Sequence, residues 1–226
     1  MTERRTTVSL HLIKSKSLFL HIPKTGGTWI EEALKAGAVE VENPGAIAEV
    51  TWRHSLLSHY RQTYGFSFTF VRHPLDWYES WWKFQSSIAW LEHEPGVWHP
   101  QRVLGRCASN TFSEFISLCI EHEPAYVTRM YEWYIGPPGF ECVDFVGRYE
   151  HLADDLVRVL RLVAEEFDEE ALRRQPPANV SITRYGEPAW EDELKARILA
   201  LEAPTINRFW RTDAGIPAGP RAWQSQ

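Results

Sequence analysis

The sequence has little cysteine and no excess of positive charge. Its 226 residues contain three cysteines, Cys107, Cys119 and Cys142, in or beside apolar segments and without C-x-x-C spacing. This pattern predicts reduced, partly buried thiols and excludes a disulfide framework. A formal net charge of -6 argues against a protein whose main role is to coat nucleic acid or a long polyanion.

Long apolar runs are also missing from the start of the chain. Lys14, Lys16 and Lys24 interrupt every early segment that could serve as a signal peptide or a membrane span. The sequence therefore predicts a cytoplasmic protein without a membrane span. Its hydrophobic fraction of 44% and charged fraction of 24% are typical of a soluble globular protein, and its length fits one domain over residues 1–226.

The stretch Ser17–Gly37, SLFLHIPKTGGTWIEEALKAG, joins an apolar run, a glycine-containing turn and an amphipathic helix. Leu18 to Ile22 has the length of a strand, which Pro23 ends by removing a backbone donor. Gly26 and Gly27 permit backbone angles closed to other residues. The helix that follows is indicated by apolar residues at helical spacing, namely Trp29, Ile30, Ala33 and Leu34.

A helix that begins directly after such a turn is suited to binding an anion. Its first amide groups lack intrahelical acceptors and lie at the positive end of the helix dipole. An anion set against Thr25 to Thr28 would be bound by the backbone, by hydroxyl groups and by the Lys24 ammonium. The expected ligand is a phosphate or phosphate-like group.

Two further apolar runs, Phe66–Val71 and Cys142–Val146, are each followed by a segment with helical spacing. Strands that alternate with helices predict an α/β fold, in which helices flank a central parallel sheet of three to five strands. We expect a P-loop-like three-layer α/β/α arrangement with all the motifs at one sheet edge. The other expected features are an edge strand within 6–13, a brief strand near Val39 and Val41, a short helix or irregular segment over Ser55–Tyr64, a helix over Leu75–Phe84, a loop over 85–110, a capping box formed by Thr111 and Glu114, and helices over 124–134, 150–167 and 189–201.

The order of residues in the turn differs from the Walker pattern G-x-x-x-x-G-K-[ST], because Lys24 precedes the glycines. HIPKTGGT resembles the 5′-phosphosulfate loop of sulfotransferases that use 3′-phosphoadenosine 5′-phosphosulfate (PAPS), in the form found in carbohydrate-type and related bacterial members. The stretch Phe68–Ser80, FTFVRHPLDWYES, resembles the 3′-phosphate motif of that family, with Arg72, Pro74 and Ser80 as its polar and turn residues. Two motifs in this order, 44 residues apart from Lys24 to Phe68, are far more specific than either alone.

The resemblance implies a site for PAPS and for its product, 3′-phosphoadenosine 5′-phosphate (PAP). Lys24 would stabilise the negative charge that sulfuryl transfer leaves on the bridging oxygen. Arg72 and Ser80 would bind the 3′-phosphate that distinguishes PAPS from ATP. The motif has no acidic pair suited to Mg²⁺, so no metal is expected. The implied cofactor-binding residues are Lys24, Thr25, Gly26, Gly27, Thr28, Trp29, Arg72 and Ser80.

A hydroxyl acceptor must lose its proton as it attacks sulfur, so the reaction needs a base. His54 lies between the two motifs, where related carbohydrate sulfotransferases place a histidine that serves as the base. The alternative is a surface histidine near a turn, with the base supplied by Glu31 or Glu32. His21 is expected to pack or hydrogen-bond beneath the loop, and His73 to cap a helix.

The acceptor region has no support from the resemblance. Tryptophans between Trp77 and Trp98 suggest a stacking pocket for a sugar or aromatic acceptor in an insertion at about 85–135, although core packing should explain at least half of them. Golgi sulfotransferases carry an N-terminal anchor, so the sequence represents either a soluble bacterial-type enzyme or a chain whose anchor has been removed. An ATP-dependent kinase and a non-catalytic nucleotide-binding module remain alternative functions.

Overall fold

The computed structural model describes residues 9–44, 54–60, 62–88, 90–94, 99–178 and 185–211. The chain divides into two compact units. The first comprises Met1–Val71, Trp133–Asn179 and Ala214–Gln226, and the second comprises Arg72–Glu132 and Val180–Asp213. A single domain over 1–226 stays a prediction, and the expected insertion at about 85–135 falls mainly among residues of the second unit.

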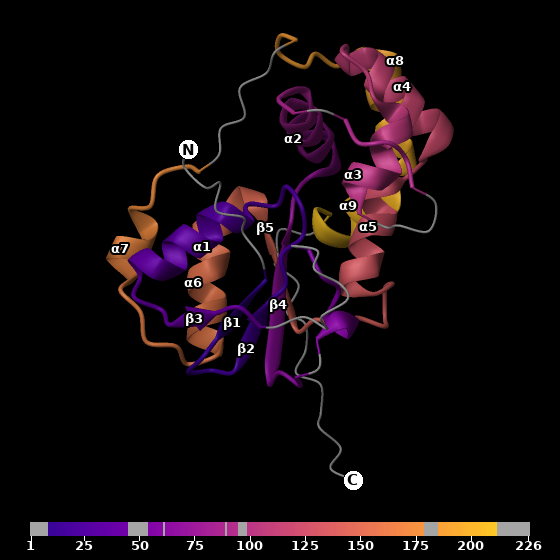
Figure 1. Ribbon diagram of the computed structural model, residues 1–226. Helices are drawn as coiled ribbons and strands as arrows, with labels where there is room; N and C mark the ends of the chain where they lie inside the picture. Colours follow the sequence, from indigo (N-terminus) through magenta and orange to yellow (C-terminus); the bar gives the residue numbers. More distant parts are fainter. Residues whose placement is uncertain are drawn as a thin grey trace. The chain divides into compact units, whose positions relative to one another are not determined.

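A five-stranded sheet forms the centre of the first unit within the described residues, with strand order β3-β1-β2-β4-β5 (Figure 1). The strands are β1 (Leu10–Leu12), β2 (Ser17–Phe19), β3 (Val41–Glu42), β4 (Phe66–Val71) and β5 (Phe145–Arg148). β2, β4 and β5 run parallel, whereas β1 is antiparallel to both β2 and β3. The predicted α/β class with a parallel core is confirmed, but the strand expected at the edge lies inside the sheet.

In the described part of the first unit, three helices flank this sheet and share one hydrophobic core with it. They are α1 (Gly27–Ala36), α6 (Leu152–Leu162) and α7 (Glu169–Arg173). α1 contributes Ile30, Ala33 and Leu34 to a cluster that also holds Phe68 and Phe70 of β4, all 0% exposed. Each such large apolar side chain contributes about 1.5 to 3 kcal/mol when buried, so the helix is anchored directly beside the turn that precedes it.

The second unit is helical in its described residues. Its elements are α2 (Pro74–Ser86), α3 (Pro100–Val103), η2 (Leu104–Cys107), α4 (Phe112–His122), most of α5 (Tyr126–Ile135), α8 (Asp192–Leu201) and α9 (Ala203–Phe209). α2 buries Trp77, Trp81 and Trp82, each at most 1% exposed, and the rings of Trp77 and Trp81 stack in parallel with centroids 5.4 Å apart. These three tryptophans are therefore core residues and offer no open stacking surface.

A buried carboxylate links four helices of this unit. Glu202, which is 0% exposed, accepts hydrogen bonds from the Tyr78 hydroxyl at 2.8 Å, from the Val127 amide at 3.1 Å, and from the Thr128 amide and hydroxyl at 2.8 and 2.6 Å. Burial raises the pKa of Glu202, and these hydrogen bonds oppose that shift in part. The carboxylate thereby ties the ends of α8 and α9 to α2 and α5.

The predicted capping box is wrong. Thr111 is the N-cap of α4, but its side chain makes no cap hydrogen bond. Instead the Ser109 hydroxyl donates to the Glu114 carboxylate at 2.6 Å and accepts from the Thr111 amide at 3.0 Å. The Ser109 hydroxyl, two residues before the N-cap, thus takes the place expected for the Thr111 hydroxyl, because it reaches both the Glu114 carboxylate and the Thr111 amide.

Several predicted element boundaries also differ from the structure. The described part of Ser55–Tyr64 contains the short 3-10 turn η1 (Leu57–His59) in irregular backbone, which agrees with the prediction of a short helix or irregular segment, whereas the expected loop over 85–110 contains the end of α2 with α3 and η2. Isolated short turns lack the length that gives a periodic signal, so the sequence pattern did not reveal them. α9 follows α8 where no element was predicted, since Pro204 is tolerated in the first turn of a helix.

Candidate functional site

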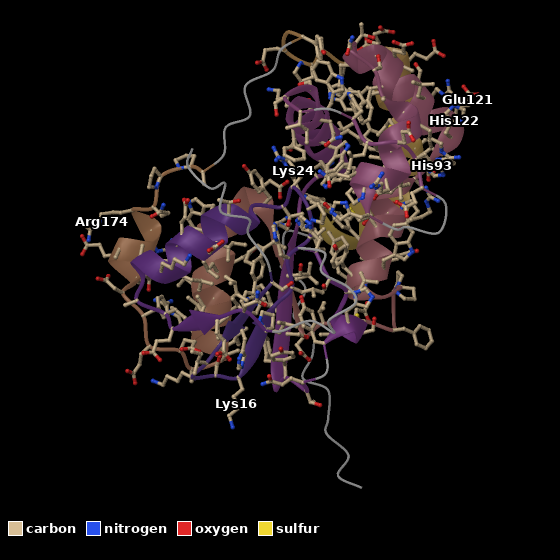
Figure 2. The ribbon with its side chains drawn as sticks, in the orientation of Figure 1. Lys16, Lys24, His93, Glu121, His122 and Arg174 are labelled. Atoms are coloured by element: carbon tan, nitrogen blue, oxygen red, sulfur yellow. The ribbon has the colours of Figure 1, made fainter. Side chains whose placement is uncertain are left out.

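The turn between β2 and α1 holds Lys24 in a left-handed backbone conformation, with φ 65°. This conformation is uncommon outside glycine and costs of order 1 to 3 kcal/mol, and residues held in it gather at active sites and ligand clamps. Figure 2 shows Lys24 and Lys16 at opposite ends of the first unit's sheet. Lys24 is half-buried and lies two residues before Gly26, the N-cap of α1.

In the described residues, the N-terminus of α1 has no side-chain cap. Its N-cap is Gly26, which has no side chain to cap the helix, and no acidic residue lies in this described first turn. The first hydrogen bond of the helix runs from the Ile30 amide to the Gly26 carbonyl at 3.0 Å. The amide groups before Ile30 therefore point out of the helix end, where the positive end of the dipole favours a negative charge.

The two glycines of the turn are required for different reasons. Gly26 has φ 94°, and a Cβ added there would also lie 2.9 Å from Leu152 Cδ2 and 3.2 Å from Tyr149 Cδ2. Gly27 does not have a left-handed φ, so the expectation that both glycines serve special backbone angles is wrong for this residue. A Cβ on Gly27 would lie 2.0 Å from Nε2 of His21, so the imidazole ring occupies the space of a side chain.

Two of the expected cofactor-binding side chains have partners within the protein. The Thr25 hydroxyl, which is fully buried, donates to the Ile22 carbonyl at 2.9 Å. The Trp29 indole donates to the Gln175 carbonyl at 3.1 Å. Both residues can therefore serve a bound anion through their backbone amides, whereas Thr28 is half-buried at the start of the helix.

His54 lies close to the turn in the first unit. Its ring centroid is 4.6 Å from that of His21, the ring that covers Gly27. The Tyr134 hydroxyl donates to the His54 carbonyl at 2.7 Å and so fixes the backbone of this segment. The prediction that His21 packs beneath the loop is confirmed.

The alternative bases on α1 both have partners. Glu31 forms an ion pair with Lys35 one turn later in the helix, and Glu32 accepts a hydrogen bond from the Gln175 side chain at 3.1 Å. These contacts are typical of solvent-facing helix carboxylates. The structure therefore gives neither carboxylate a particular place at the turn.

Tyr134, Tyr149 and Leu152 contribute to this site although sequence reasoning did not select them. Tyr149 and Leu152 lie in FVGRYEHLADDL, a segment that resembles the late strand-to-helix junction of carbohydrate-type sulfotransferases. In the structure this junction consists of β5, the turn η3 (Tyr149–His151) and the start of α6. That weaker resemblance was the signal that could have identified the two residues packed on Gly26.

Arg72 and Ser80 belong to the second unit, at the start of α2 and within it. The Arg72 backbone is held on both sides, because its amide donates to the Tyr131 hydroxyl at 2.9 Å and its carbonyl accepts from that hydroxyl at 2.7 Å. His73 is the N-cap of α2, but its side chain makes no cap hydrogen bond. Its ring packs edge-on against that of Trp210, with ring centroids 5.3 Å apart. The backbone fixation of Arg72 limits where its guanidinium can reach.

The other predicted site features receive less support. Trp90 is half-buried and packs on Phe115 with ring centroids 5.7 Å apart, and Trp98 lies outside the described residues. The described ranges contain no group of three or more His, Cys, Asp or Glu side chains that could bind a metal ion. No helix in that part of the chain is long and apolar enough to cross a membrane.

The comparisons with known proteins point to one family. The sequence profile of the sulfotransferase family matches residues 13–198, a span that includes the turn at Lys24, the segment of His54 and the start of α2. No curated protein and no solved structure matches the chain. The profile covers well over half of the sequence, and the chain therefore belongs to the sulfotransferase family.

Proposed function

We propose that this protein transfers the sulfuryl group of PAPS to a hydroxyl of a sugar or small-molecule acceptor. Membership of the sulfotransferase family supports sulfuryl transfer, and the finer identification of the donor rests on the turn before α1. The observation that carries the proposal is the left-handed Lys24 next to a helix N-terminus whose glycine N-cap supplies no side chain of its own. This arrangement suits the sulfate and 5′-phosphate of PAPS.

Lys24 and the first amides of α1 would act where charge develops. The acceptor oxygen attacks sulfur and forms the new S–O bond, while the bond from sulfur to the bridging oxygen breaks and its electron pair stays on the 5′-phosphate, giving PAP. A preorganised ammonium and helix amides lower the free energy of that developing charge. The strained backbone at Lys24 is consistent with such preorganisation.

Arg72 and Ser80 are the residues that we propose for the 3′-phosphate of the donor. A guanidinium presents a fork that matches phosphate oxygens, and a hydroxyl on the following helix can add a further hydrogen bond. The Tyr131 hydroxyl holds the Arg72 backbone from both its amide and its carbonyl, so the guanidinium starts from a fixed position. This pair would make the protein prefer 3′-phosphorylated nucleotides.

His54 is the proposed general base, which would take the proton of the acceptor hydroxyl as the new bond forms. Its support is positional, because its ring contacts the same His21 imidazole that covers Gly27 of the turn. A base must lie within hydrogen-bond reach of the proton that it removes in the reacting complex. The alternative bases remain Glu31, which pairs with Lys35, and Glu32, which accepts a hydrogen bond from Gln175.

Calorimetric titration with PAP, ADP and ATP tests the identity of the donor. We expect PAP to bind the wild-type chain and to bind more tightly than ADP and ATP, because only PAP carries the 3′-phosphate. Equal affinities for the three nucleotides would contradict the proposed role of Arg72 and Ser80. Tighter binding of ATP would favour the kinase alternative.

A substitution of His54 separates binding from chemistry. His54→Ala should leave PAP affinity within about twofold and lower the rate of sulfuryl transfer about a hundredfold to ten-thousandfold, the usual contribution of a positioned base. Added imidazole should restore part of the lost rate in this variant. A His54→Ala protein with the wild-type rate would show that another group takes the proton.

A further inference from the structure

The imidazole of His21 is almost fully buried and packs against groups of the first unit. It is 6% exposed, its ring stacks on that of Phe19 with centroids 5.9 Å apart, and it also lies against Gly27 and His54. Nε2 and Cδ2 of His21 would lie 2.0 and 2.1 Å from a Cβ on Gly27. The ring therefore fills the space between the start of α1 and the ring of His54.

Polar side chains lie between the backbone of His21 and the segment that carries His54. The His21 amide donates to the Ser9 hydroxyl at 3.1 Å. The Tyr60 hydroxyl in turn forms hydrogen bonds with the side chains of Ser9 and Ser55, and burial raises its pKa. Because Ser55 follows His54 directly, these side chains link the backbone of His21 to the segment that carries His54.

We propose that His21 is a positioning residue for sulfuryl transfer, which holds the ring of His54 at a fixed place relative to the turn that contains Gly27. The inference rests on the proposed function of His54 as the base. The His21 imidazole packs against both the first turn of α1 and the ring of His54, so the position of the His54 ring depends on that turn.

Such a contact has a large effect on rate because a base works only over a narrow range of positions. A displacement of about 1 Å at a reacting group can lower a rate about a hundredfold while binding changes little. Interiors are close-packed, so removal of an enclosed ring allows its neighbours to shift or to sample several positions. Without the His21 ring, the His54 ring loses one of its lateral supports.

The first test is a double-mutant cycle on the rate of sulfuryl transfer. His21→Ala should lower the rate about tenfold to a hundredfold and leave PAP affinity within about threefold. In a His54→Ala background, His21→Ala should cause no further loss, because the residue acts through His54. An equal fractional loss in both backgrounds, or no loss in either, would overturn the inference.

His11 provides the matched control for this cycle. It is also 6% exposed and lies in the first unit, but its ring contacts Tyr64 and its Nδ1 lies 2.8 Å from a Glu42 carboxylate oxygen. His11→Ala should keep the wild-type transfer rate per folded molecule. A loss in His11→Ala as large as that in His21→Ala would assign the effect to a general disturbance of the sheet.

A substitution on the opposite side of the ring tests the same contact without removing His21. Gly27→Ala should lower the rate, because the new methyl group must displace the imidazole. In the His21→Ala background, Gly27→Ala should lower the rate by a smaller factor than it does in the wild type, since the methyl group then has space. A combined variant that is slower than His21→Ala by the full factor of Gly27→Ala would contradict the inference.

Nuclear magnetic resonance distinguishes a failure of this inference from a failure of the base assignment. In the PAP complex of ¹³C-histidine-labelled protein, the His54 ring signal, identified by its loss in His54→Ala, should move or broaden in His21→Ala and stay in place in His11→Ala. An unchanged His54 signal in His21→Ala overturns the positioning role. A moved signal with an unimpaired rate in His54→Ala supports the contact and overturns only the base.

Discussion

Gly26 offers the sharpest physical test of the turn before α1. Its φ of 94° is one that L-residues rarely adopt, and an added Cβ would lie 2.9 Å from Leu152 Cδ2. A left-handed backbone costs an L-residue roughly 1 to 2 kcal/mol, and forcing a methyl group into a packed site costs about 1 to 3 kcal/mol. Because the end of a leucine side chain can shift, we expect Gly26→Ala to lower the free energy of unfolding by about 2 to 4 kcal/mol.

Urea denaturation measures this change, with Gly65→Ala as the control. Gly65 does not have a left-handed φ, and a Cβ there would have no heavy atom of the described residues within 4 Å. Gly65→Ala should therefore stay within about 0.5 kcal/mol of the wild type, as surface substitutions usually do. PAP affinity should fall in Gly26→Ala and remain unchanged in Gly65→Ala. Equal stability of the two variants would refute the assigned role of the Gly26 backbone.

Three further predictions concern the charged residues. Lys24→Ala should lower turnover at least about a hundredfold, the scale of losing one preorganised stabilising group. Lys16→Ala, which removes another left-handed lysine, should leave turnover at the wild-type value in the same steady-state assay. Arg72→Ala should weaken PAP binding by about 1.5 to 3 kcal/mol but barely affect ADP, and calorimetry that finds equal losses would make Arg72 structural. Burial raises the pKa of Glu202, so the folded state binds more protons than the unfolded state. The free energy of unfolding should therefore fall as pH rises through that raised pKa. This pH dependence should vanish in Glu202→Gln, and its persistence there would refute the assignment to Glu202.

The parts of the fold that the sequence predicted are those with strong local signals. The apolar run of β4 and the turn at Lys24 were located correctly, because a strand buried on both faces and a helix start leave distinct patterns. The antiparallel pairing of β1 with β2 and β3 depends on contacts between segments distant in sequence. No local pattern in three- and two-residue strands contains that information.

The candidate site shows the same division between local and distant information. Lys24 and Gly26 could be selected from the motif, and the structure gives both of them left-handed backbones. The need for glycine at position 27 could not be predicted. It arises because the His21 ring occupies the space of a side chain there, and only the folded turn brings that ring against Gly27. Likewise the hydrogen bond from Tyr134 to the backbone of His54 joins residues 80 positions apart.

Sulfuryl transfer from PAPS is tested most sharply by an assay that follows both products of the reaction. The wild-type chain is incubated with PAPS and a panel of sugar and aromatic hydroxyl acceptors, and mass spectrometry quantifies PAP and sulfated acceptor, with ATP in place of PAPS as a parallel arm. We expect one PAP for each sulfated acceptor, a rate that is reduced in Lys24→Ala but not in Lys16→Ala, and no phosphorylated acceptor from ATP. A phosphorylated acceptor from ATP, with no sulfated product from PAPS, would contradict the proposed function.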